Sequence, residues 1–64
     1  MTDLQLMTMP ELRHEARLRA NVLENVKQRI RDQPPGWERN QSLQREVIAR
    51  ANLKEALDEI ALRA

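Results

Sequence analysis

The first half of the chain carries an apolar stripe with the three- and four-residue spacing of an α-helix that buries one side. The stripe consists of Leu12, Ala16, Ala20, Leu23, Val26 and Ile30. Thr8 precedes it as a candidate N-cap, and Glu11, three residues later, completes the pattern of a capping box. Pro10 suits the first turn because its missing N–H would have no intrahelical partner there. These signals predict a helix over residues 9–32.

A helix-breaking segment follows this stripe. Pro34 and Pro35 lack backbone donors, and each pushes the residue before it out of the helical region. Pro35 and Gly36 also suit the two central positions of a type II turn. A second apolar pattern then runs to the end of the chain and predicts a helix over residues 38–63. Its candidate N-caps are Asn40 and Ser42.

A short connection between two long helices is typical of an antiparallel αα-hairpin. We therefore expect an all-α fold in which residues 1–64 form a single helical hairpin domain, with residues 33–37 as its turn. Residues 1–7 are expected to form an N-terminal arm, where Thr2 and Gln5 can cap one short turn.

Heptad positions, as in a coiled coil, predict how the two helices face each other. The seam of the second helix is expected to consist of Leu43, Val47, Arg50, Lys54, Leu57, Ala61 and Ala64. In this register Ile30 packs on Leu43 next to the turn. Two ion pairs are expected on the flanks, Arg13 with Asp58 and Arg29 with Glu46. Exposed pairs of this kind contribute at most about 1 kcal/mol each, so they set the register more than the stability.

A second apolar face remains outside this predicted seam. It consists of Leu18, Val22, Ala49, Leu53, Ala56 and Ile60. A solvated two-helix hairpin has no reason to expose such a strip, and a chain of this length buries only about 60% of the surface of its unfolded state. We therefore expect a C2 homodimer that forms a four-helix bundle through these residues. Burial of the same face against a different protein is the alternative.

The composition excludes several classes of protein. The chain has no Cys and a single His, so it offers neither a disulfide nor a thiolate or His-rich metal site, and we expect no cofactor. Eleven basic residues against ten acidic ones give a formal net charge of +1, which argues against a general polyanion binder. No apolar run approaches the roughly 18 residues of a membrane span, and the N-terminus lacks the pattern of a signal peptide. We expect a cytoplasmic protein with no membrane partner.

Two features suggest chemistry at first. Glu11 and His14 have the Glu-x-x-His spacing of di-iron bundles. Leu12, however, lies in the buried stripe, which turns both side chains away from the core. The only Ser, Ser42, has no His or Lys evidently placed to activate it. We therefore expect neither a metal site nor an enzyme.

Three cations fall inside the predicted seam: Arg19, Arg50 and Lys54. In one interpretation their stems lie along apolar surface while their charged heads reach Glu15 and Glu46, each of which stands four residues before an Arg. In the other, the three cations form a pocket for an anionic ligand or an acidic partner segment.

A basic row and the only aromatic residue complete the candidate sites. The row consists of Arg13, Arg17, Lys27 and Arg31. It is either a solvated face held in local ion pairs or a set of nucleic-acid contacts that a dimer would double. Trp37 either plugs the open end of the hairpin or anchors a partner.

These patterns together favour a small non-catalytic protein-interaction module that acts as a homodimer. Such a module would serve as an adaptor, an inhibitor or an assembly or regulatory factor. The alternative function is a dimeric regulator that binds DNA or RNA through the basic row on the first helix.

Overall fold

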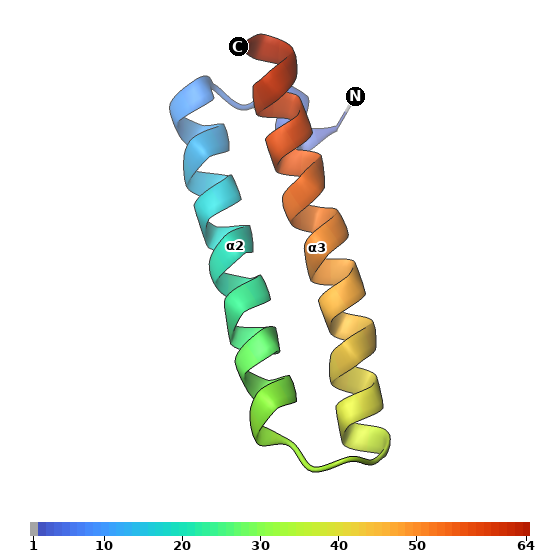
Figure 1. Ribbon diagram of the computed structural model, residues 1–64. Helices are drawn as coiled ribbons and strands as arrows, with labels where there is room; N and C mark the ends of the chain where they lie inside the picture. The colour runs from blue at the N-terminus through green and yellow to red at the C-terminus, as the bar shows by residue number, and fades with distance from the viewer. Residues whose placement is uncertain (1) are drawn as a thin grey trace.

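The computed structural model describes residues 2–64, which form a helical hairpin (Figure 1). A short helix, α1 (Asp3–Leu6), precedes the long helices α2 (Met9–Asp32) and α3 (Trp37–Arg63). The two long helices run antiparallel, and the molecule measures 41 × 19 × 15 Å along its principal axes. The predicted all-α hairpin is confirmed: α2 has the predicted bounds, and α3 starts one residue earlier than predicted.

The start of α2 is fixed by the capping box that the sequence predicts. The Glu11 carboxylate accepts the Thr8 N–H at 2.9 Å and the Thr8 hydroxyl at 2.8 Å, while the Thr8 hydroxyl oxygen accepts the Glu11 N–H at 3.4 Å. These hydrogen bonds, first the one from the Thr8 backbone, lower the pKa of Glu11 from its ordinary value of 4.5. Thr2 and Gln5 cap α1 in the same way, because the Gln5 side chain accepts the Thr2 N–H at 3.0 Å.

The turn differs from the predicted type II turn. Gly36 has φ 158° and ψ −173°, whereas the third position of a type II turn has φ near about +80° and ψ near about 0°. Gly36 instead caps α3, and its carbonyl accepts the Asn40 N–H at 3.1 Å. Such a backbone conformation is open to glycine and strained for other residues. Neither Asn40 nor Ser42 is therefore the N-cap of α3.

Ser42 closes the turn end of the hairpin from the inside. It is 4% exposed, and its hydroxyl donates to the Gln33 side-chain oxygen at 2.7 Å. Gln33 is the C-cap of α2, where its N–H donates to the Arg29 carbonyl at 2.9 Å. This side-chain bond ties the end of α2 to the second turn of α3.

The predicted seam of α3 is wrong by about one residue, which corresponds to a rotation of about 100° about the helix axis. The α3 residues that face α2 are Ser42, Ala49 and Ala56, all buried, with the half-buried Leu53 and Ile60. The predicted seam residues Leu43, Val47 and Leu57 are 42%, 69% and 49% exposed. Small residues at every seventh position let α3 approach α2, whose larger Leu12 and Leu23 fill the space between them.

Charge explains why the other register does not form. The predicted register would place Arg50 and Lys54 between the helices, where no acidic residue lies at the same level to pair with them. Desolvating two unpaired cations costs more than exposing a few aliphatic side chains. In the structure the Arg50 and Lys54 side chains are 60% and 79% exposed.

Residues 2–7 are held against the last turns of α3 by one arginine. Arg63 donates to the carbonyls of Leu4 and Gln5 at 3.0 Å each and also to the carbonyl of Met7. Glu59 holds the Arg63 guanidinium in place at 3.0 Å. The cation thereby satisfies the free carbonyls at the end of α1. Leu4, which is 4% exposed, closes this end of the core.

Candidate interaction surfaces

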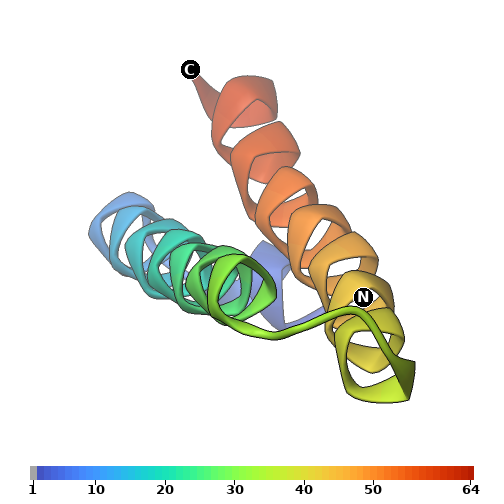
Figure 2. The ribbon, with the colours of Figure 1, turned by 60° about the horizontal axis from the view of Figure 1, so that its bottom comes forward.

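One side of the hairpin carries an apolar groove between α2 and α3. Two adjoining depressions of about 330 and 200 Å³ share Val22, Ala49 and Asn52 and therefore form one continuous groove. Leu18 lines one end of it, and Ile48 lines the other. We call this side of the molecule the groove face. Figure 2, in which the turn end comes forward, shows that α2 and α3 are inclined to each other rather than parallel.

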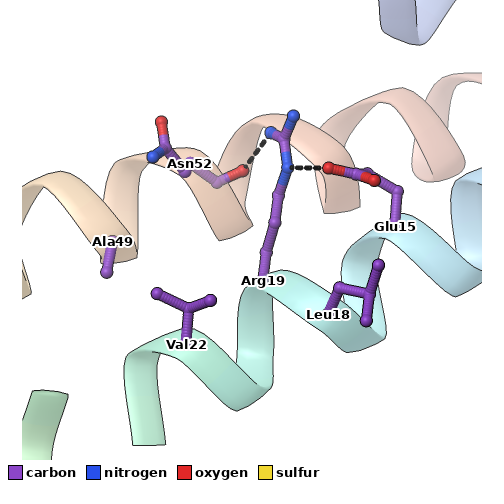
Figure 3. Close-up of a pocket in the computed structure, with 6 residues that line it drawn as sticks. All are labelled: Glu15, Leu18, Arg19, Val22, Ala49 and Asn52. Carbon is purple, nitrogen blue, oxygen red and sulfur yellow. Dashed lines mark hydrogen bonds and ion pairs between the residues drawn. The ribbon is translucent and has the colours of Figure 1, made fainter. Parts of the chain in front are cut away.

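Arg19 closes the groove toward the free ends of the hairpin (Figure 3). Its guanidinium lies 3.0 Å from the Glu15 carboxylate, donates to the Asn52 carbonyl at 2.6 Å and lies 3.9 Å from the Glu55 carboxylate. The side chain crosses from α2 to α3 and is 23% exposed. The predicted pair of Glu15 with Arg19 is confirmed, and this arginine joins the two helices.

Charges along the groove face divide it into an acidic end, an apolar middle and a basic end. On α2, Glu15, Val22 and Arg29 stand seven residues apart, and on α3, Arg45, Asn52 and Glu59 do the same. Residues seven apart lie on the same side of a helix. Because the helices are antiparallel and the Arg19 guanidinium reaches the Asn52 carbonyl, both acids lie toward the free ends and both arginines toward the turn.

The two ends of the groove face differ in how their charges are paired. Glu15 and Glu59 each pair with an arginine of the same chain at 3.0 Å, and the Glu55 side chain beside them is 55% exposed. Arg29 and Arg45 are exposed and make no ion pair within residues 2–64. Glu38, seven residues before Arg45, is the acid at this end, so the two arginines leave an excess of positive charge there.

The residues predicted as the dimer interface divide into two groups. Leu18 and Val22 are 46% and 54% exposed and line the groove. Ala49 and Ala56 are 6% and 0% exposed because they fill the seam against α2. The half-buried Leu53 and Ile60 also face α2. These four residues lie in the seam because α3 is rotated from the predicted register.

Ile48 is an exposed apolar residue of the groove that the predicted set of interface residues missed. It is 61% exposed and lines the groove with Val22 and Val26. The predicted register placed Ile48 on a remote side of α3, and the rotation of α3 brings it next to α2. The same rotation makes Val26 a groove residue at the edge of the seam.

The opposite side of the hairpin combines positive charge with exposed apolar residues, and we call it the basic face. A shallow depression of about 300 Å³ is lined there by Lys27, Ile30, Arg31, Glu46 and Arg50. Leu43, Val47, Arg50, Lys54, Leu57 and Ala61 follow one another on α3 at spacings of three and four residues. This outer stripe of α3 is exposed along its whole length.

The predicted anion cluster does not assemble. Arg19 lines the groove, whereas Arg50 lines the depression on the opposite side. Arg50 pairs with Glu46 at 2.6 Å, as predicted, and Lys54 pairs with Asp58 at 3.6 Å. These local pairs occupy both acids of the predicted flank pairs with Arg13 and Arg29, and neither flank pair forms.

The basic row on α2 keeps most of its charge unpaired within residues 2–64. Lys27 pairs with Glu24 at 3.5 Å. Arg13, Arg17 and Arg31 are exposed and make no ion pair in this part of the chain. The interpretation of this row as cations held in local pairs therefore applies to Lys27 alone.

Trp37 does not plug the turn end of the hairpin. Its side chain is 68% exposed at the first residue of α3, in a shallow depression shared with Pro34 and Pro35. Ser42 and Gln33 close that end instead. The role of Trp37 as an anchor for a partner stays a prediction.

The residues with the spacing of a metal motif do not form a ligand cluster. The Glu11 carboxylate is occupied as the cap of α2, and His14 is exposed. Residues 2–64 contain no group of three or more His, Cys, Asp or Glu side chains positioned to hold an ion.

In the same part of the chain, no helix combines the length and hydropathy that crossing a bilayer requires. No protein family, curated protein or solved structure matches this chain.

Proposed function

We propose that this chain is a non-catalytic protein-interaction module that acts as a homodimer, with the groove face of one copy packed on the groove face of another. The observation that carries the proposal is the exposure of Leu18, Val22 and Ile48, which are 46%, 54% and 61% exposed around one continuous groove. Contiguous aliphatic surface of this kind marks an interaction site in a small domain. The resulting assembly is a four-helix bundle that serves as an adaptor, an inhibitor or an assembly factor.

The area exposed by a single copy supports pairing. A compact monomer of 7.5 kDa exposes about 4,200 Å², whereas this hairpin exposes 4992 Å². A standard protein interface buries about 800 Å² on each partner. The excess of roughly 700 Å² is therefore close to the area that one partner of this kind would cover.

The charge pattern supports a second copy as the occupant and also favours one orientation. When the copies pack with each helix antiparallel to its counterpart, Val22 meets Val22 of the second copy, and each Glu15 approaches an Arg29. On α3, each Arg45 approaches a Glu59 in the same way. In the other two-fold arrangement α2 lies over α3, so acid faces acid at one end and arginine faces arginine at the other. Like charges at close range are unfavourable, so the antiparallel arrangement is preferred.

Two matched valine substitutions test the dimer. Val22 and Val47 are 54% and 69% exposed and lie on opposite sides of the hairpin. We expect Val22→Glu to weaken self-association at least about 100-fold, because two carboxylates would be desolvated against each other at the two-fold axis. Val47→Glu should leave self-association within about threefold of the parent, a difference below about 0.7 kcal/mol. Sedimentation equilibrium over a dilution series measures both constants.

The helix content of the two variants separates dissociation from misfolding. Circular dichroism should show that Val22→Glu keeps its helices at concentrations where it is monomeric, or loses them only as it dissociates. If both variants dimerise as tightly as the parent, the groove face is not the interface and the proposed homodimer is wrong. If Val47→Glu alone disrupts the dimer, the interface lies on the basic face instead.

A single-cysteine variant tests the antiparallel orientation. The chain contains no Cys, so Val22→Cys introduces a unique thiol next to the expected two-fold axis. We expect rapid formation of a disulfide-linked dimer under mild oxidation, because the axis brings the two copies of this position together and a disulfide requires Cα atoms within about 7 Å. Val47→Cys is the control and should stay monomeric on a non-reducing gel. Equal cross-linking of both variants, or of neither, would contradict this orientation.

A further inference from the structure

The basic face differs from the groove face in that all its unpaired charge is positive. Its three acids, Glu24, Glu46 and Asp58, are each paired with a neighbouring cation. Arg13 and Arg31 have no ion pair within residues 2–64. Two basic faces brought together would repel each other, so a second copy of this chain is a poor occupant.

The basic face also offers an apolar track of helical length. Leu43, Val47 and Leu57 are 42%, 69% and 49% exposed along the outer stripe of α3. At about 1.5 Å per residue, the stripe from residue 43 to residue 61 is about 27 Å long. The basic residues of α2 line the side of the depression opposite this stripe. An apolar track beside a row of cations matches a helix with one aliphatic side and acidic flanks.

We propose that the basic face binds an acidic amphipathic helix of another protein. The aliphatic side of that helix would cover Leu43, Val47 and Leu57, and its carboxylates would reach the unpaired arginines of α2. Recognition of this kind uses anchors at spacings of three and four residues together with charge-assisted hydrogen bonds from arginine. The proposal rests on the proposed interaction role but uses the face that the dimer leaves free.

The same cations would also attract a nucleic acid, and the apolar track decides between the two partners. Phosphate contacts neutralise the arginines but leave exposed aliphatic side chains uncovered. The exposed stripe carries no aromatic residue on which bases stack. A partner helix covers the aliphatic residues and the cations together, so the acidic helix is favoured.

The binding test uses a designed peptide of about 20 residues, matched to the length of the stripe. It carries leucines at heptad spacing and glutamates on the flanks, and a control peptide replaces each glutamate by lysine. A labelled DNA duplex and an RNA duplex of similar length serve as the competing class of ligand. Fluorescence anisotropy is measured against the parent chain, Val47→Glu and Asn25→Glu at low and moderate salt.

We expect the acidic peptide to bind at least about tenfold more tightly than the lysine peptide, a difference of about 1.4 kcal/mol. Val47→Glu should weaken that binding at least tenfold by placing a carboxylate in the apolar track. Asn25→Glu adds the same carboxylate at an exposed position of α2 that lines neither depression, and it should change the binding less than threefold. Added salt should reduce the affinity without abolishing it, because part of the contact is apolar.

Three outcomes would overturn the proposal. The first is equal binding of the two peptides, and the second is acidic-peptide binding that Val47→Glu leaves unchanged. The third is tight duplex binding that falls steeply with salt and ignores Val47→Glu, which would assign the basic face to nucleic acid. If the peptide tests fail while the chain still dimerises, the proposed acidic partner helix is wrong and the proposed homodimer is unaffected. A monomeric parent chain that binds the acidic peptide would refute the homodimer alone.

Discussion

Replacing Leu12 by Ala is expected to lower the free energy of unfolding by about 2–5 kcal/mol, because the substitution leaves a cavity in a fully buried site. Leu12 is 0% exposed and is the largest fully buried side chain of the described residues. The other buried leucines are Leu4 and Leu23, so few contacts remain to compensate. At about 0.05–0.15 kcal/mol per residue, a chain of this size has a total stability of roughly 3–10 kcal/mol. We therefore expect the substitution to lower the melting temperature by at least roughly 8 °C, at about 4–8 °C per kcal/mol for a domain of this size.

Urea denaturation followed by circular dichroism measures this effect. The matched control is Leu62→Ala, since Leu62 is 81% exposed on α3 and the same atoms are removed there. The control should change the free energy of unfolding by less than about 0.5 kcal/mol. Equal effects of the two substitutions would mean that Leu12 does not lie in the core of the hairpin.

Replacing Ala56 by Leu is expected to destabilise the hairpin by about 1–3 kcal/mol or more, since the seam has no room for three further carbon atoms. Ala56 is 0% exposed at the contact between α3 and α2. A leucine at this position forces the helices apart, and it should also weaken the dimer, because the groove between the helices changes shape.

The matched control for this overpacking is Ala51→Leu. Ala51 is exposed on α3, so a leucine there should leave the melting temperature within about 2 °C of the parent, in line with the small effects of surface changes. Thermal melting of both variants decides the register of the hairpin. A harmless Ala56→Leu would place Ala56 outside the seam, on the second apolar face to which the heptad pattern assigned it, and the rotation of α3 described above would be wrong.

The helices themselves could be predicted from the sequence because their ends carry strong local signals. Thr8 and Glu11 mark the start of α2 by a pair of hydrogen bonds within four residues, and Pro34 and Pro35 leave the chain no way to continue the helix. The start of α3 is less clear in sequence, since Gly36 caps it through a backbone conformation rather than through a side chain.

The register could not be predicted because the apolar residues of α3 are distributed around the helix. Val47, Ile48 and Ala49 are consecutive, so each points to a different side and several heptad assignments fit equally well. The prediction chose the larger residues for the seam, whereas close approach of two helices favours small ones such as Ala49 and Ala56. The predicted seam contained Arg50 and Lys54, and burial of these two cations without an acidic partner argued against that register.

The error in register also changed which residues were predicted to form the interaction surfaces. Leu18 and Val22 were correctly placed outside the seam, because α2 has a single clear stripe. Ile48 was missed, since its neighbourhood depends on the rotation of α3. The contacts of Arg63 with the arm join residues almost a full chain length apart, and no periodic pattern signals them.

Sedimentation equilibrium of the unmodified chain at micromolar concentration, followed by dilution, shows whether a second copy covers the groove face. We expect a mass of twice 7.5 kDa that falls toward 7.5 kDa on dilution, with a melting temperature that falls in parallel. A chain that stays at 7.5 kDa at every concentration, with a melting temperature independent of dilution, would contradict it.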